Sequence, residues 1–420
     1  MDGRIDNIPP TLPAAVTGMG CMAGGGTDVN SLWHNLVQAA VNCHPVPDYL
    51  FKTVLDYPVF AAPADCFSER ARLLVAETAP EFKQESVSRT VLLTCSAVAE
   101  ALQQAGVSSD YLRSVRVGIA LGTTVGCTFH NEEYYSAWRN GLEPDLDPVQ
   151  FYLAGNVASA MHRILGTSGP SAVITNACAS GTDAIGVARN WLASGQCDIA
   201  IAGGADELSR VAYNGFVSLM LADKDPCRPF SKDRKGLNLG EGAGVVVLER
   251  QEASATRQCQ PLGWVRGYGC AADAWHPTAP HPEGRGLKAA LRQALRDCGD
   301  VKLLPALVNA HGTGTKANDK AETSALAEIF PKTEELVVVS TKGITGHTLG
   351  AAGGIEAILT LMALRAGQTP GTVGCREPDP ELALMPVIQT ENRQLSGRLG
   401  ISQSLAFGGG NSALVLEAAS

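Results

Sequence analysis

The sequence predicts an α/β protein in which one pattern of strands and helices occurs twice. Short apolar runs rich in β-branched residues alternate with amphipathic segments, as in sheets covered by helices. The order β-α-β-α-β-α-β-β recurs in both halves, apart from insertions in the first. With 45% apolar and 18% charged residues, the composition is that of a globular protein. We therefore expect a duplicated, layered α-β-α-β-α fold with two mixed sheets, divided into residues 1–250 and 251–420.

The first half begins with a short buried strand at Ala14–Thr17. The G-M-G-C-M-A that follows is interpreted as a tight glycine turn. Its alternative, a dinucleotide fingerprint, lacks the acidic residue expected about 20 residues later. Five prolines between residues 41 and 85 predict an irregular excursion over the surface. The other predicted elements are helices at 30–40, 88–105 and 156–165, and strands at 115–121, 173–175, 199–202 and 245–249.

A short polar linker, residues 251–261, separates this half from the second. The predicted strands of the second half are 264–268, 306–309, 336–340, 399–404 and 412–417, and its predicted helices are 284–298, 320–330 and 350–366. Because ligands of open α/β sheets bind beyond the carboxyl ends of the strands, we expect the functional site where those ends converge.

Charge and composition exclude several classes of function. The net charge of −9 opposes general binding to nucleic acids or anionic membranes. The twelve cysteines lack C-x-x-C pairs or zinc-type spacing, so we expect no metal site. The N-terminus lacks the apolar core of a signal peptide, and we expect no apolar run long enough to cross a membrane. A cytoplasmic protein with reduced thiols is the expectation.

Cys178 is the first candidate nucleophile. It follows an apolar run that ends at Thr175, and the small residues around it lead into a predicted helix whose only nearby charged residue is Asp183. A strand that turns directly into a helix exposes one side chain, and the helix N-terminus favours a thiolate there. The alternative is a small apolar cysteine packed in a tight turn.

Three loops of the second half supply partners for such a thiol. One carries His311 in N-A-H-G-T-G-T-K, a second carries Lys342 and His347 ahead of a helix with Glu356, and the third reads L-A-F-G-G-G-N. Each histidine alone is more often a capping or packing residue than a catalyst. Together, one cysteine, two histidines and a lysine at strand ends form the constellation of a covalent catalyst.

These motifs resemble a known family. N-A-C-A-S-G, R-P-F-S-K-D-R, N-A-H-G-T-G-T-K-A-N-D-K-A-E, S-T-K-G-I-T-G-H-T-L-G-A-A-G and F-G-G-G-N occur in the order found in elongating β-ketoacyl-acyl-carrier-protein synthases, decarboxylating condensing enzymes of the thiolase fold. The resemblance covers nearly the whole chain. It implies condensation of malonyl and acyl groups delivered by an acyl carrier protein, without a resident cofactor, because phosphopantetheine arrives on the carrier.

The resemblance also implies a role for each catalytic residue. Cys178 would take the acyl chain as a thioester, while His311 and His347 would bind the malonyl thioester carbonyl and promote loss of carbon dioxide. Lys342 resembles the active-site lysine of the family, with Glu356 as its expected ion-pair partner. Two neutral histidines aimed at one developing enolate oxygen stabilise it far better in a dry site than in water.

Substrate contacts follow from the same resemblance. Thr313 and Thr315 would contact the phosphopantetheine arm, and the backbone N–H groups of Cys178 and Phe407 would form the oxyanion hole. Phe407 and Gly408 belong to a glycine-rich segment expected to act as a gate. Asn131, in the polar pocket-facing stretch 124–133, is a further substrate-binding candidate.

Some residues depart from the commonest pattern of the family. The gate usually reads G-F-G-G-T-N, whereas here Ala406 replaces the first glycine and Gly410 the threonine. We expect the extra Cβ at position 406 to narrow the conformational range of the hinge. K-G-L-N-L-G-E-G, with Lys235 and Asn238, resembles ketosynthases of polyene and aryl-polyene pathways. A polyene-, polyketide- or fatty-acid-type chain is therefore the expected substrate.

Other condensing enzymes fit less well. A thiolase needs a second catalytic cysteine near the C-terminus, where this chain has Phe407. A starter-type enzyme pairs one histidine with an asparagine. A non-catalytic chain-length factor usually loses the nucleophile, and a purely carrier-binding role is weaker still. A homodimer and a heterodimer with a chain-length factor both remain open. Exposed basic residues expected to receive the acidic carrier protein are Lys83, Arg89, Arg139 and Lys224.

Overall fold

Ten strands form one mixed sheet whose two halves repeat the same topology. The computed structural model describes residues 11–125, 132–146, 149, 156–299, 304–330, 332 and 335–419. The sheet order is β3-β2-β4-β5-β1-β6-β12-β11-β7-β8. The strands are β1 (Ala14–Ala23), β2 (Val117–Gly122), β3 (Ser171–Ile174), β4 (Ile199–Asp206), β5 (Gly242–Arg250), β6 (Gly263–Ala272), β7 (Leu307–Asn309), β8 (Val338–Val339), β11 (Leu399–Leu405) and β12 (Gly410–Ala418).

The duplication is visible in the strand order. Numbered within its own half, each set of five strands runs 3-2-4-5-1 from the outer edge of the sheet to the middle. In both halves the three outer strands are parallel, and the two inner strands pair antiparallel. A separate ribbon pairs β9 (Gln368–Pro370) with β10 (Asn392–Gln394).

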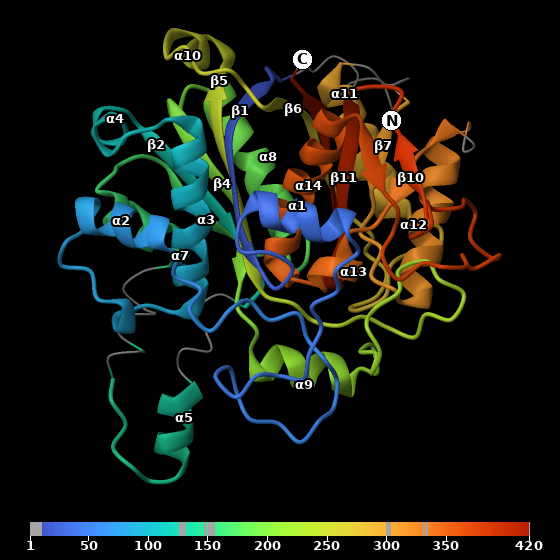
Figure 1. Ribbon diagram of the computed structural model, residues 1–420, viewed down its shortest axis with the longest axis horizontal. Coiled ribbons are helices and arrows are strands. Elements are labelled where there is room, and N and C mark those ends of the chain that lie inside the picture. The colour runs from blue at the N-terminus through green and yellow to red at the C-terminus, as the bar shows by residue number, and fades with distance from the viewer. Residues whose placement is uncertain are drawn as a thin grey trace.

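The two predicted sheets are hydrogen-bonded to each other. At one end of β1, Ala14, Ala15 and Val16 pair with β6, so the two five-stranded parts are continuous at this point. Elsewhere they diverge around two central helices, α8 (Ser180–Ala193) and α14 (Ala352–Ala366), which pack on each other and on strands of both halves (Figure 1).

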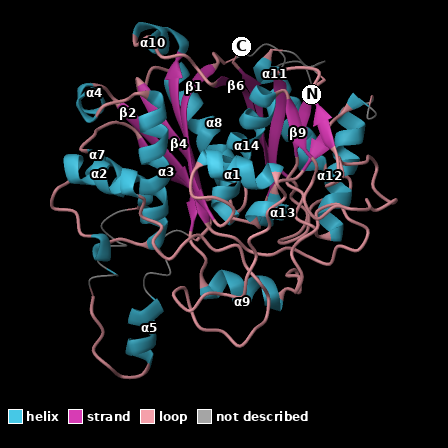
Figure 2. Cartoon of the chain, in the orientation of Figure 1, coloured by secondary structure: helices cyan, strands magenta, loops and turns pink. Residues whose placement is uncertain are grey.

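Outer helices complete the five layers. On the first half, α3 (Arg89–Ala105) packs on β1 and β5, with α2 (Glu69–Thr78) and α7 (Val157–Leu165) against it. On the second half, α11 (Arg285–Cys298) packs on β6 and β12, with α12 (Lys316–Ile329) beside it. The layered α-β-α-β-α fold expected from the sequence is confirmed. Figure 2 shows the strands running between the helical layers.

The described chain contains further α-helices. They are α1 (Val29–Val37), α4 (Ser109–Ser114), α5 (Glu132–Arg139), α9 (Arg210–Ser218), α10 (Gln251–Thr256) and α13 (Lys342–Thr345). In Figure 1, α9 lies below the sheet beside long loops of the first half, and α5 projects away from the body.

The predicted glycine turn after Thr17 is wrong, because β1 continues to Ala23. Gly18 and Gly20 lie within this strand, where it packs directly on the backbone of α3. A Cβ would come within 2.0 Å of the Ala101 oxygen at Gly18, and within 1.9 Å of the Ala97 oxygen at Gly20. These glycines therefore permit close packing of a helix on a strand.

One stretch of the described chain, Leu349–Ala366, is long and apolar enough to cross a membrane, with a mean hydropathy of 1.4. The sequence analysis expected no such run. The stretch includes α14, one of the two central helices, and 83% of it is buried, so it belongs to the core.

Candidate active site

Cys178 lies on a tight turn between β3 and α8. Ala177 has a left-handed backbone, with φ of 42°, which is uncommon for a residue with a side chain. The Ser180 hydroxyl closes the turn: it accepts from the Asn176 N–H at 2.8 Å and donates to the Ala177 carbonyl at 2.6 Å. The side chain of Cys178 is thereby directed into the interior, where the residue is 3% exposed.

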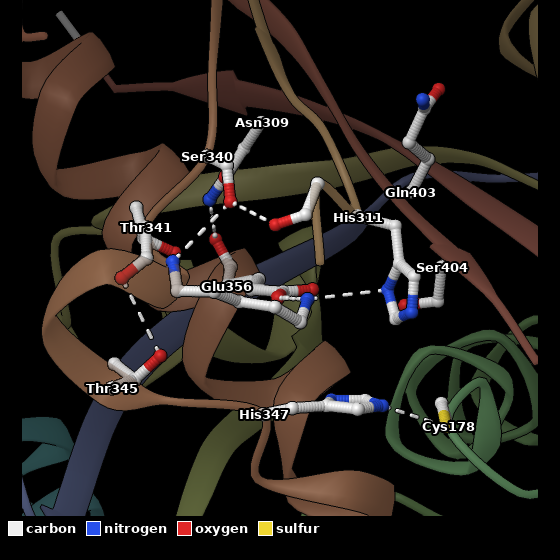
Figure 3. A network of polar contacts seen from close by, with 12 residues as sticks. Cys178, Asn309, His311, Ser340, Thr341, Thr345, His347, Glu356, Gln403 and Ser404 are labelled. Atoms are coloured by element: carbon white, nitrogen blue, oxygen red, sulfur yellow. Dashed lines mark hydrogen bonds and ion pairs between the residues drawn. The ribbon is translucent and has the colours of Figure 1, made fainter. Parts of the chain in front are cut away.

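Both predicted histidines meet the thiol. The Nε2 atom of His347 lies 2.9 Å from the sulfur of Cys178. This sulfur and a ring nitrogen each of His311 and His347 all lie within 4.8 Å of one another. The two imidazole rings are almost perpendicular, with centroids 5.1 Å apart. Figure 3 shows His311 and His347 beside Cys178; His311 follows β7, and His347 follows α13.

Lys342 orients His311. Its Nζ atom lies 3.2 Å from His311 Nδ1 and also forms a buried ion pair with Glu356, the expected partner. Because an ammonium group donates only, His311 Nδ1 must accept, and the ring proton of the neutral histidine is then on Nε2. Burial, and next the Lys342 charge, hold the pKa values of both histidines well below their usual range. Both are therefore neutral at pH 7.

The expectation of a thiolate stabilised by the helix N-terminus is wrong. Burial raises the pKa of the Cys178 thiol to about 12, although the Lys342 charge and a hydrogen bond from the Phe407 N–H act in the opposite direction. Helix α8 begins at Ser180, two residues beyond the thiol. Cys178 is thus a neutral thiol in contact with a neutral histidine that can take its proton.

Glu322 is a site residue that the sequence analysis missed. It lies on α12 and accepts hydrogen bonds from the backbone N–H groups of His311 and Gly312, and from the side chain of Gln403 at 2.8 Å. It therefore fixes the loop that carries His311. Its position as the last residue of N-A-H-G-T-G-T-K-A-N-D-K-A-E was the available signal.

The glycine-rich segment 406–410 packs against α9. The Phe407 ring lies parallel to that of Phe216 on α9, with centroids 5.1 Å apart, and Phe216 also contacts the His347 ring edge-on. Gly408 and Gly409 have φ of 83° and 81°, a region that favours glycine. Ala406 has an extended backbone, with φ of −130°. Phe216 was not identified from the sequence.

A cavity of about 310 Å³ leads to Cys178 and both histidines. Thr313 and Thr315 line it, and their hydroxyl oxygens lie 2.9 Å apart. Lys235 and Lys316 also line the cavity. The side chain of Asn238 is buried and donates to the Asp223 carbonyl at 2.8 Å. Asn131 lies outside the described residues.

The basic residues proposed to receive a carrier protein do not all form a free surface. Arg89 points inward, where its side chain is 17% exposed and forms an ion pair with the buried carboxylate of Glu241. Lys224 is exposed but ion-paired with Asp56 at 2.8 Å. Arg89 is therefore a structural residue.

Comparisons with known proteins agree with the fold. Residues 12–254 match the β-ketoacyl synthase N-terminal domain, and residues 262–376 match the β-ketoacyl synthase C-terminal domain. The chain is 33% identical over 413 residues to nodulation protein E of Rhizobium meliloti (strain 1021), which covers 96% of this chain and 98% of that relative. It is also 32% identical over 414 residues to 3-oxoacyl-acyl-carrier-protein synthase 2 of Synechocystis sp., and this match covers 96% of this chain and 97% of that relative.

A solved structure described as the ishigamide ketosynthase/chain length factor aligns with a TM-score of 0.89 and 30% sequence identity, covering 98% of this chain and 100% of that chain. The two family matches together span most of the sequence. The chain therefore belongs to the β-ketoacyl synthase family, as an acyltransferase-type condensing enzyme of the 3-oxoacyl-acyl-carrier-protein synthase kind.

Proposed function

We propose that this chain lengthens a carrier-bound acyl chain by two carbons, using Cys178 as the nucleophile and malonyl-carrier protein as the two-carbon donor. The observation that carries the proposal is the contact of His347 Nε2 with the Cys178 sulfur, beside a His311 ring held by Lys342. A thiol with a base, next to a second neutral imidazole, suits acyl transfer followed by stabilisation of an enolate.

The first step is acyl transfer. The Cys178 proton moves to His347 Nε2 as the sulfur attacks the carbonyl of the incoming acyl thioester. The bond to the pantetheine sulfur then breaks, and this sulfur leaves as a thiol with the proton from His347. The Phe407 N–H, which acts to lower the pKa of the Cys178 thiol, would donate to the carbonyl oxygen that receives negative charge.

The second step removes carbon dioxide from the malonyl group. The bond to the carboxylate breaks, and its electron pair forms an enolate whose oxygen accepts a hydrogen bond from His311 Nε2–H. His347 can supply a second donor, because an acylated Cys178 no longer needs a base. No described residue holds the other ring nitrogen, Nδ1, in a hydrogen bond. A neutral ring can therefore carry its proton on Nε2.

Condensation completes the cycle. The enolate carbon attacks the acyl-Cys178 carbonyl, the carbon–sulfur bond breaks, and Cys178 leaves as a thiolate that regains a proton from water. The β-ketoacyl chain remains on the carrier. Thr313 and Thr315 would hold the pantetheine arm within the cavity. The arm arrives on the carrier protein, so the proposed reaction uses no resident cofactor, and the proposed location is the cytoplasm.

Replacement of His311 separates the two steps. The protein is incubated with an acyl carrier protein bearing an acyl group, and then with one bearing malonyl. We expect His311→Ala to load Cys178 with the acyl group at near the wild-type rate, while malonyl decarboxylation falls by about 10²–10³, the usual effect of losing one such donor. Mass spectrometry of the Cys178 peptide and release of labelled carbon dioxide report the two steps. Condensation at the wild-type rate in this variant would contradict the assigned role.

The second candidate is that the chain is the catalytic subunit of a heterodimer with a chain-length factor. The 30% identity to a structure described as a ketosynthase/chain length factor supports it. A fatty-acid-, polyene- or polyketide-type substrate is proposed in either case. Purification of the tagged chain from its native cell distinguishes the two assemblies: a homodimer yields one polypeptide, and the heterodimer yields an equimolar partner of similar size that lacks the nucleophilic cysteine.

A further inference from the structure

Two features noted in the sequence have no part in the chemistry above. One is Asp183, the charged residue near the nucleophile, and the other is Gly410, which stands where the gate motif usually has threonine. In the folded chain both contact the side chain of Asn176, which precedes Cys178 by two residues.

Asp183 accepts hydrogen bonds from side chains in three different segments of the fold. Its Oδ2 accepts from Asn176 Nδ2 at 2.7 Å, and its Oδ1 accepts from the Tyr268 hydroxyl at 2.9 Å and from the Ser412 hydroxyl. Asp183 is on α8, Tyr268 on β6 and Ser412 on β12. The carboxylate therefore ties the turn of the nucleophile to the strand that follows the gate.

Tyr268 is held as a donor in this cluster. Its ring packs on α8 so closely that a Cβ at Gly186 would lie 2.4 Å from a ring carbon. Burial, and next the charge of Asp183, raise the pKa of its hydroxyl well above the usual range. The hydroxyl thus keeps its proton and keeps donating to Asp183.

Gly410 is needed because there is no room for a side chain at this position, and not because of its backbone conformation. Its φ of −66° and ψ of 137° are open to any residue. A Cβ at this position, however, would lie 2.3 Å from Asn176 Oδ1 and 2.9 Å from its Cγ. The carboxamide of Asn176 therefore fills the room that a side chain at position 410 would need, with Asp183 on one side and the end of the gate on the other.

We propose that Asn176 and Asp183 are positioning residues that lock the gate segment 406–410 to the nucleophile turn, so that Phe407 stays beside Cys178, with which it lines the cavity. The proposal rests on the function assigned to Cys178. It explains why Gly410 and Asn176 occur together: the carboxamide provides the link that a side chain at position 410 would otherwise block.

A double-mutant cycle tests the link. We expect Gly410→Ala to lower the condensation kcat by about tenfold or more, because the methyl group displaces the carboxamide and the oxyanion donor with it, and loss of one such donor costs about 10²–10³. Asn176→Ala should lower kcat to a similar level. In the Asn176→Ala background, the same Gly410→Ala change should cost less than about twofold, since the space is then free. KM for the carrier substrates should stay constant throughout.

Asp183 and a control glycine complete the series. Asp183→Asn should lower kcat less than Asp183→Ala, because its single amide oxygen can accept either from Asn176 or from the two hydroxyl groups, but not from both sides. Asp183→Ala should match Asn176→Ala. Gly397→Ala is the matched control, since its Cβ would meet only the Ala306 side chain, at an ordinary 3.4 Å. An equal cost of Gly410→Ala in both backgrounds, or no cost in either, would overturn the proposal.

Amide hydrogen exchange tests the link without using activity. Exchange across residues 406–410 should quicken in Gly410→Ala and in Asn176→Ala, and the double variant should be no faster than Asn176→Ala. If wild-type protein catalyses no condensation, the proposed function fails and the exchange cycle alone decides the link. Unchanged exchange in both single variants would refute it.

Discussion

Replacement of Lys342 by methionine should separate the stability of the site from its chemistry. Lys342 is 1% exposed and forms an ion pair with Glu356, whose second carboxylate oxygen has no hydrogen-bond partner among the described residues. Methionine removes the partner of a buried carboxylate. It also removes the donor that holds His311 Nδ1 at 3.2 Å, on which the position of the ring proton depends.

The loss of stability and the loss of chemistry should respond differently to a second substitution. Breaking one side of a buried ion pair costs about 3–5 kcal/mol of unfolding free energy, because a charge remains buried and unpaired. The burial that raises the pKa of Glu356 to about 6 acts in the same direction. Changing Glu356 to glutamine in the same protein removes that charge, so Lys342→Met/Glu356→Gln should regain most of the lost stability. Malonyl decarboxylation should be about 10²–10³ slower in both variants, because neither directs His311.

Urea unfolding measures the stability, and release of carbon dioxide from malonyl-carrier protein measures the chemistry. Acyl loading of Cys178 is measured in parallel and should fall less than decarboxylation, since its base is His347. Recovery of decarboxylation together with stability in the double variant would refute the role of Lys342 in orienting His311. An undiminished unfolding free energy in Lys342→Met would refute the buried ion pair.

Three further predictions follow from the buried charges. Burial raises the pKa of Glu207 from 4.5 to about 7, so its ionisation lowers the unfolding free energy as pH rises from about 4.5 to 7. Between pH 5 and 8.5, Glu207→Gln should lose up to about 3 kcal/mol less unfolding free energy than wild type, as measured by urea titration. In His347→Ala, the rate of acyl loading should fall by about 10²–10⁴ at pH 7. The remaining rate should rise tenfold per pH unit, because ionisation of a thiol with a pKa of about 12 replaces the base. A pH-independent rate, measured by rapid-quench mass spectrometry, would refute this. Arg89→Met should cost about 3–5 kcal/mol of unfolding free energy by leaving Glu241 unpaired, with no change in KM for the carrier protein.

Local pattern was enough to predict the fold and the main catalytic contacts. Alternating strands and helices specify the layers, and the repeated order specifies the duplication that the sheet order 3-2-4-5-1 makes explicit. Cys178 and His311 follow strands, and His347 follows the short helix α13 after β8. The carboxyl ends of strands converge in such folds. The pairing of Lys342 with Glu356 was expected from the family resemblance, and the structure contains this ion pair.

Features that depend on packing between distant segments were not predictable in this way. The glycines of β1 read as a turn because nothing local shows that α3 lies against them. Phe216 stacks on Phe407 across almost 200 residues of chain, and no motif connects them. The pKa of Cys178 followed burial by the whole core, whereas the sequence indicated only the nearby helix N-terminus. Nothing in the sequence around Arg89 indicates that it pairs with Glu241, a buried carboxylate 152 residues away.

A single-turnover experiment tests the central claim most directly. The protein is loaded with an acyl group from its carrier, Cys178 occupancy is measured by mass spectrometry, and malonyl-carrier protein with a labelled free carboxylate is added. We predict that each acyl group lost from Cys178 yields one labelled carbon dioxide and one carrier-bound β-ketoacyl chain two carbons longer. A β-ketoacyl product formed while Cys178 stays unacylated, or formed with the labelled carbon retained, would contradict the account.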